Sequence, residues 1–104
     1  NGCIAPVIKN NVIYNMVLAS SPNLAAIELA SGIFENPVIE GNIITGLSNT
    51  STSGYGAWGI NIAGTVTNAT ITNNIISNLY SFGWNNTSAS YNDFAIRIGG
   101  TQTA

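Results

Sequence analysis

Residues 37–47 read PVIEGNIITGL, and this stretch decides the fold because the chain carries two further copies of it. Residues 6–16 read PVIKNNVIYNM, and residues 69–79 read ATITNNIISNL. The copies begin at residues 6, 37 and 69, which are 31 and then 32 residues apart. A repeat of this length indicates one supersecondary unit stacked on copies of itself, so the pattern predicts a solenoid.

The aligned copies alternate between apolar and polar columns. Three columns are apolar in every copy: Ile8, Ile39 and Ile71, then Ile13, Ile44 and Ile76, then Met16, Leu47 and Leu79. Polar or amphipathic residues lie between them, and a period of two residues is typical of a strand. Two further columns hold only Asn or Gly: Asn10, Gly41 and Asn73, then Asn15, Gly46 and Asn78. Because Asn and Gly adopt positive φ most readily, each of these positions is predicted to be a left-handed bend.

A weaker series of apolar–polar–apolar segments follows each copy. Residues 26–30 read AIELA, residues 59–63 read GINIA, and residues 95–99 read AIRIG. Three short strands, two corners and one loop of variable length predict a triangular coil, whose strands pair in parallel with the next coil ~4.8 Å away. The predicted fold is a single all-β domain of three coils, at about 1–34, 35–66 and 67–104.

This pattern resembles the right-handed, single-stranded parallel β-helix repeat of the pectate-lyase-like superfamily. A coil of that family reads roughly Gly-Ile-x-Ile, then x-Ile-x-x-Asn-x-Ile-x-x-Asn, and the match covers nearly the whole chain. The resemblance implies that Asn11, Asn42 and Asn74 stack as an inward asparagine ladder. Such a ladder satisfies polar groups that would be costly to bury alone. The same solenoid carries lyases, hydrolases, epimerases, adhesins and phage fibres, so the resemblance implies a fold more than an activity.

The composition excludes several kinds of partner and chemistry. Charged residues make up only 6% of the chain and the net charge is −2, which gives no footprint for nucleic acid and none for an anionic membrane. The apolar runs are far shorter than the ~20 residues that a membrane span needs. Cys3 is the only cysteine and histidine is absent, so we expect no metal site, no cofactor and no nucleophile–histidine pair. The sequence reads as a mature or excised piece of a longer solenoid. Its ends are expected to associate with adjoining coils or with copies of itself.

The second strand series predicts a polar column on one outer face. Glu28, Asn61 and Arg97 occupy equivalent positions in successive coils, so Glu28 and Arg97 are expected ~9.6 Å apart with Asn61 between them. A carboxylate, an amide and a guanidinium in a row could bind a sugar acid or its hydroxyls. The competing interpretation is a solvated stripe that keeps this face soluble. The scattered acids match neither the calcium cluster of a pectate-type lyase nor the paired carboxylates of an inverting glycosidase.

Aromatic residues gather in the loop that lengthens from coil to coil. Tyr80, Trp84 and Tyr91 are candidate glycan contacts, because an amphipathic ring offers sugars an apolar platform with a polar rim. Packing of the loop on itself is the alternative. Trp58 and Phe94 share a column two residues before Ile60 and Ile96, and that spacing places both in the core.

The columns that flank the first corner raise a question about packing. They are Val7, Val38 and Thr70 on one side and Val12, Ile43 and Ile75 on the other. Strict alternation turns them outward as an apolar stripe, whereas a twisted corner would turn the second set partly inward. Lys9 and Glu40 share a neighbouring column on adjacent coils and are expected to form an ion pair.

The sequence therefore favours a structural or adhesive segment of a secreted or surface-displayed bacterial β-helix protein, with polysaccharide as the expected partner. The alternative is a part of a polysaccharide lyase or glycoside hydrolase whose catalytic groups lie mostly outside these residues.

Overall fold

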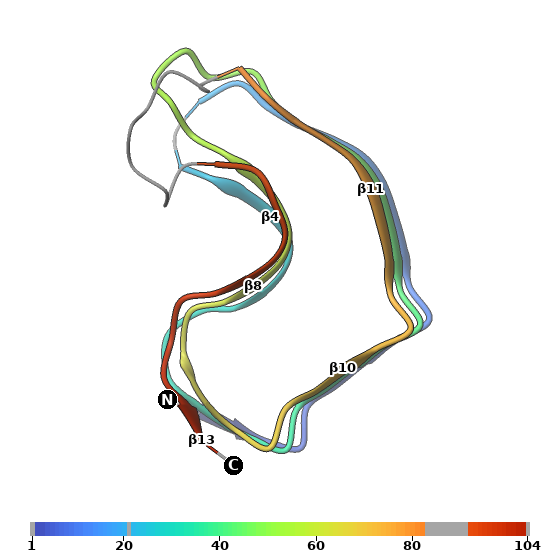
Figure 1. The fold of residues 1–104 in the computed structure, drawn as a ribbon, viewed down its shortest axis with the longest axis vertical. Coiled ribbons are helices and arrows are strands. Elements are labelled where there is room, and N and C mark those ends of the chain that lie inside the picture. The colour runs from blue at the N-terminus through green and yellow to red at the C-terminus, as the bar shows by residue number, and fades with distance from the viewer. Residues whose placement is uncertain (1, 21, 83–91, 104) are drawn as a thin grey trace.

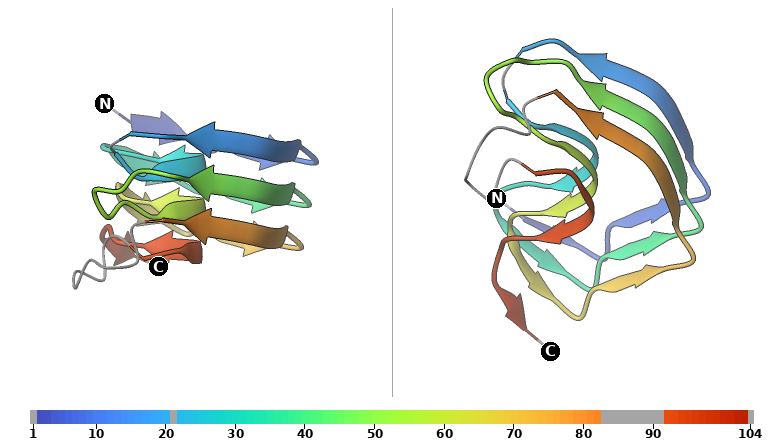
Figure 2. Two further views of the ribbon diagram at one scale, coloured as in Figure 1. Left: turned by 90° about the horizontal axis from the view of Figure 1, so that it is seen from above. Right: turned by 45° about the horizontal axis from the view of Figure 1, so that its top comes forward.

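The computed structural model describes residues 2–20, 22–82 and 92–103, and within these ranges all regular structure is β-strand. The chain winds through three stacked coils, each strand lying beside its equivalents (Figures 1 and 2). Coil 1 contains β1 (Gly2–Ile4), β2 (Val7–Lys9), β3 (Val12–Leu18) and β4 (Leu24–Leu29). Coil 2 contains β5 (Ile33–Glu35), β6 (Val38–Glu40), β7 (Ile43–Asn49) and β8 (Ala57–Ile62). Coil 3 contains β9 (Thr65–Thr67), β10 (Thr70–Thr72), β11 (Ile75–Ser81) and β12 (Phe94–Ile98), and β13 (Gln102–Thr103) begins a fourth turn.

All four sheets are parallel, which confirms the predicted solenoid. Their strand orders are β1-β5-β9-β13, β10-β6-β2, β11-β7-β3 and β12-β8-β4. The prediction of three strands per coil is wrong, because it missed the series that contains β1, β5, β9 and β13. These strands have only two or three residues each, too few for alternation to be recognised among the surrounding Ser, Thr and Gly.

The corners have the backbone that the Asn and Gly columns predict. Asn10, Gly41 and Asn73 have φ of 54°, 67° and 55°. The second column, Asn15, Gly46 and Asn78, has φ of 53°, 70° and 53°, but it lies within β3, β7 and β11, so the second predicted corner is not a boundary between strands. A third left-handed column joins the missed strand series to β2, β6 and β10 and contains Ala5, Asn36 and Asn68, with φ of 50°, 50° and 53°.

The core lies inside the coils, and coil 2 forms its centre. Ile39, Ile44 and Leu47 are almost completely buried there, because a coil covers them on each side. The register aligns each of them with its counterparts in coils 1 and 3, as the apolar columns predict.

The structure places Asn11, Asn42 and Asn74 in one hydrogen-bonded column. Asn42 is 0% exposed, and its Oδ1 accepts from the backbone N and from Nδ2 of Asn11, each at 3.0 Å. Its Nδ2 donates to Asn74 Oδ1 at 2.9 Å and to Ile8 O at 3.0 Å. The Asn42 side chain therefore joins coil 1 to coil 3 through bonds that also bind the corner backbone.

The two flanking columns form an apolar stripe on the outside. Val12 is 62% exposed and Ile75 is 61% exposed, so the corner does not turn the second column inward. The expected ion pair beside this stripe is present, with Lys9 Nζ 2.7 Å from Glu40 Oε2 and both side chains partly exposed.

Candidate functional site

The strands of the β12-β8-β4 sheet curve toward the inside of the coil, so the outer face of this sheet is concave (Figure 1). All six residues of β8 are buried. Gly59 lets the β8 backbone lie close to the backbone of Ala95 and to the side chain of Ile76. A Cβ at this position would lie 2.6 Å from Ala95 O and 2.6 Å from Ile76 Cγ2. A glycine in a strand often marks such an approach or a break in the alternation.

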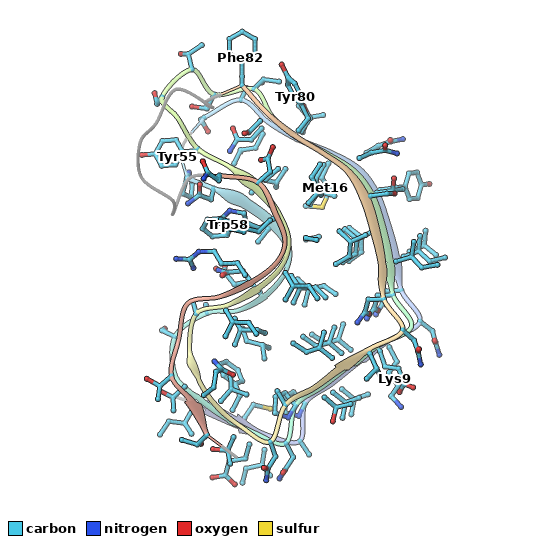
Figure 3. The ribbon with its side chains drawn as sticks, in the orientation of Figure 1. Lys9, Met16, Tyr55, Trp58, Tyr80 and Phe82 are labelled. Carbon is cyan, nitrogen blue, oxygen red and sulfur yellow. The ribbon has the colours of Figure 1, made fainter. Side chains whose placement is uncertain are left out.

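Trp58 lies on the concave outer side of β8, opposite to the coil interior that Met16 faces (Figure 3). Trp58 is buried as predicted and pairs in register with Phe94, which is partly buried. Neither side chain, however, belongs to the core cluster that contains Ile60 and Ile62. The alternation breaks at Gly59, so counting by two from Ile60 gives the wrong side. Trp58 is only 6% exposed, and its Nε1 donates to Asn92 O at 2.8 Å.

The predicted polar column lies on this same face. Asn61 pairs in register with Glu28 of β4 and with Arg97 of β12. Asn61 Nδ2 donates to Glu28 Oε1 at 2.6 Å, and Arg97 Nη1 donates to Asn61 Oδ1 at 3.1 Å. Asn61 is 2% exposed, whereas Glu28 is exposed and Arg97 is partly exposed. A buried amide thus links a carboxylate and a guanidinium across three coils.

Arg97 is held in one orientation by its surroundings. Its Cζ lies 4.8 Å from the centre of the Trp58 ring, within the range of a cation–π interaction. Gly99 lets the guanidinium lie against the backbone, because a Cβ there would come within 2.6 Å of Nη1. The Arg97 donors that face away from Asn61 are therefore presented by a side chain that has already lost much of its freedom.

A second set of polar side chains holds the loop where it enters β8. Asn23 Oδ1 accepts from Gly56 N at 2.7 Å, and Asp93 Oδ1 accepts from Ala57 N at 2.8 Å. Asn49 is fully buried and donates to Gly56 O at 3.2 Å. Sequence reasoning missed these residues, although an Asn or Asp next to the start of a strand is a recognisable loop signal.

The candidate aromatic residues do not join this face in the described structure. Tyr80 is 52% exposed and lies on the outer side of β11, away from Trp58 (Figure 3). Trp84 and Tyr91 lie outside the described residues. The structure therefore brings together Glu28, Asn61 and Arg97 with Trp58, and places Tyr80 apart from them on a different sheet.

The acidic residues that the structure describes are spread over several elements. Glu28, Glu35 and Glu40 lie on three different strands, and Asp93 lies in the loop before β12. Across 2–20, 22–82 and 92–103, no three His, Cys, Asp or Glu side chains are close enough to hold a metal ion. The same ranges contain no helix that is long and apolar enough to cross a membrane.

Comparison of the chain with protein-family models, with curated proteins and with solved structures finds no match. The geometry of the concave face is therefore the basis for any functional assignment.

Proposed function

We propose that the chain is a structural, adhesive segment of a secreted or surface-displayed bacterial β-helix protein of the pectate-lyase-like type, and that it contacts polysaccharide. The observation that carries this proposal is the closed polar column. The side-chain amide of Asn61 is hydrogen-bonded to both Glu28 and Arg97, so these three side chains link neighbouring coils. A hydrogen-bonded column that holds a carboxylate and a guanidinium in fixed positions is better suited to binding a ligand than to transferring a proton.

Sugar hydroxyls and carboxylates are suitable ligands for the exposed parts of this column. The outer guanidinium donors of Arg97 can bind either group, and the free carboxylate oxygen of Glu28 can accept from a hydroxyl. Strand spacing separates the two residues by ~9.6 Å, which allows one extended chain to reach both. Tyr80 supplies an exposed ring on the adjoining sheet, and Trp84 and Tyr91 belong to the same proposal as loop contacts.

Affinity electrophoresis through gels that contain single polysaccharides tests this role. Arg97→Gln should weaken retention at least ~10-fold, the usual size of an effect from losing a charged hydrogen bond. Lys9→Gln is the matched control, because it removes one positive charge from a different face and should leave retention unchanged. Equal losses in both variants, or no retention by any acidic or neutral polysaccharide, would refute the proposal.

A second candidate is a part of a polysaccharide lyase or glycoside hydrolase. It is favoured by Glu28 and Arg97, a carboxylate and a cation on one concave face with solvent access. Incubation with uronic-acid polysaccharides, followed by absorbance of new double bonds and by assay of reducing ends, separates the two functions. Depolymerisation that Arg97→Ala abolishes would replace the adhesive proposal with the enzymatic one.

A further inference from the structure

The sheet formed by β11, β7 and β3 carries no charge. Its strands are residues 12–18, 43–49 and 75–81, and they contain no Lys, Arg, Asp or Glu. They are also the longest strands in the described ranges, with seven residues each. Each of the other three sheets contains at least one charged residue, namely Glu35 in one, Lys9 and Glu40 in another, and Glu28 and Arg97 in the third. We call the outer surface of the β11-β7-β3 sheet the uncharged face.

The middle coil shows that the side chains of this face point outward. Ile43 is 41% exposed although a coil lies on each side of it, and Thr45 and Ser48 of the same strand are partly exposed. The exposure therefore comes from the side of the coil and does not depend on where the chain begins or ends. The register places Ile43 beside Val12 and Ile75, which are 62% and 61% exposed.

Aliphatic side chains and hydroxyl groups are interleaved on the uncharged face. Thr45 Oγ1 accepts from Ser77 Oγ at 3.0 Å and from Asn78 Nδ2 at 3.1 Å. The hydroxyl hydrogen of Thr45 is therefore left to donate to a ligand. Three columns run across the coils: Val12, Ile43 and Ile75, then Tyr14, Thr45 and Ser77, then Val17, Ser48 and Tyr80.

Two tyrosine rings lie on this face. Tyr14 is 62% exposed and Tyr80 is 52% exposed, and Tyr80 points away from the coil (Figure 3). Two strand spacings, ~9.6 Å, and a rise of three residues, ~10 Å, separate their positions. Phe82 adds a third exposed ring directly after β11. A ligand that contacts both tyrosines must therefore extend across all three coils.

We propose that the uncharged face binds the surface of a solid, uncharged polysaccharide. Sugars present C–H surfaces beside hydroxyl groups, which match the interleaved aliphatic, aromatic and hydroxyl groups of this face. The lack of charge favours an uncharged polymer, because an ionised group would lose hydration here and meet no opposite charge. Polysaccharide as the partner rests on the proposed function, whereas this face and this class of polysaccharide are additional to it.

The open shape of the face favours a solid over a small sugar. Sites for small ligands are concave and bury most of the ligand, whereas a sheet on the outside of a coil covers a ligand from one side only. A second copy of the chain fits less well. The centre of a homodimer interface is enriched in apolar groups and depleted in Ser, and this face has Thr45, Ser48 and Ser77 near its centre.

Sedimentation with particles of microcrystalline cellulose, and separately with chitin particles, tests this binding. The full chain should bind at least one solid, and about 1 M NaCl should not release it, because no charge takes part. Tyr14→Thr combined with Tyr80→Ser should weaken binding at least ~10-fold through the loss of two ring contacts. Both replacements are the residues that coil 2 has at the same register positions, Thr45 and Ser48. Circular dichroism checks that the double variant is folded.

Ile33→Thr is the matched control. It also removes an exposed apolar side chain, since Ile33 is 57% exposed, and it introduces the residue of its register partner Thr65. Because β5 belongs to a different sheet, this variant should bind the solids as the unchanged chain does. Arg97→Gln tests the concave face and should also leave this binding unchanged. Gel retention that Arg97→Gln lowers, without binding to either solid, would overturn the solid-polysaccharide proposal alone.

The absence of binding to both solids overturns the proposal, and so does release by salt. Equal losses in the double tyrosine variant and in Ile33→Thr overturn it as well, because the loss would then not belong to the uncharged face. A dimer in sedimentation equilibrium that the double tyrosine variant dissociates would assign this face to a second copy of the chain instead.

Discussion

Replacement of Asn42 by alanine is the most direct test of what holds the coils together. The Asn42 side chain takes part in four hydrogen bonds, to Ile8, Asn74 and two groups of Asn11. Alanine removes all four, at a position whose own side chain is completely buried while its partners are partly buried or exposed. At about 1 kcal/mol for each bond, the variant should lose about 4 kcal/mol of unfolding free energy. That is a large fraction of the ~5–15 kcal/mol that stabilises a typical domain.

The end of the ladder provides the internal comparison. The Asn11 side chain takes part in two bonds, and its site is exposed. Asn11→Ala should therefore cost about 1–2 kcal/mol, because water can replace what is lost. The ratio of the two losses separates a buried ladder from a general preference for asparagine at these positions.

Urea unfolding measures both losses. Far-ultraviolet circular dichroism and tryptophan fluorescence should give coincident transitions, and a shift in midpoint at constant m gives the change in free energy. The reasoning is refuted if Asn42→Ala costs less than about 1 kcal/mol, or no more than Asn11→Ala.

Three further changes address the corners, the surface and the concave strand. Ala5→Asn should raise the unfolding free energy by about 1 kcal/mol, because alanine is strained at φ 50° and Asn tolerates it; a lower urea midpoint would contradict this. Glu40→Gln should cost less than about 1 kcal/mol in dilute buffer and nothing in 1 M salt, since its ion pair with Lys9 is partly exposed; a loss that persists in salt would show another role. Gly59→Ala should cost about 1–3 kcal/mol, because the added Cβ meets Ile76 and a backbone oxygen at 2.6 Å, and an unchanged thermal midpoint would disprove that packing.

Much of this fold could be predicted because the repeat occurs three times, so each position of a coil is represented by three residues. The bends at Asn10, Gly41 and Asn73 were predictable since only two residue types occupy that column. The column of Glu28, Asn61 and Arg97 was predictable for a related reason. Residues at equivalent positions of the repeat lie side by side when the strands pair in parallel and in register.

The features that were not predicted depend on departures from the regular apolar–polar alternation of a strand. Trp58 is buried, as predicted, but on the outer side of β8 (Figure 3), which its spacing from Ile60 does not predict because Gly59 breaks the alternation within the strand. The fourth strand series was missed because its strands have only two or three residues, and because the corner column that follows them, Ala5, Asn36 and Asn68, is not uniform in residue type. Asn23 and Asp93 each hydrogen-bond to the backbone of a neighbouring coil, at Gly56 and Ala57. The loops of these coils differ in length, so an alignment of the repeats does not place these partners at equivalent positions.

The ladder also constrains how the chain folds. Asn11 and Asn42 are 31 residues apart, Asn42 and Asn74 are 32 apart, and Asn61 and Arg97 are 36 apart. A single coil therefore gains few of its stabilising bonds until the following coil has been synthesised and wound beside it. Because loops of this length must close before any contact stabilises them, folding should be slow for a chain of this size and should start from two coils together. During synthesis, a coil cannot pair with the coil that follows it until about thirty further residues have emerged from the ribosome.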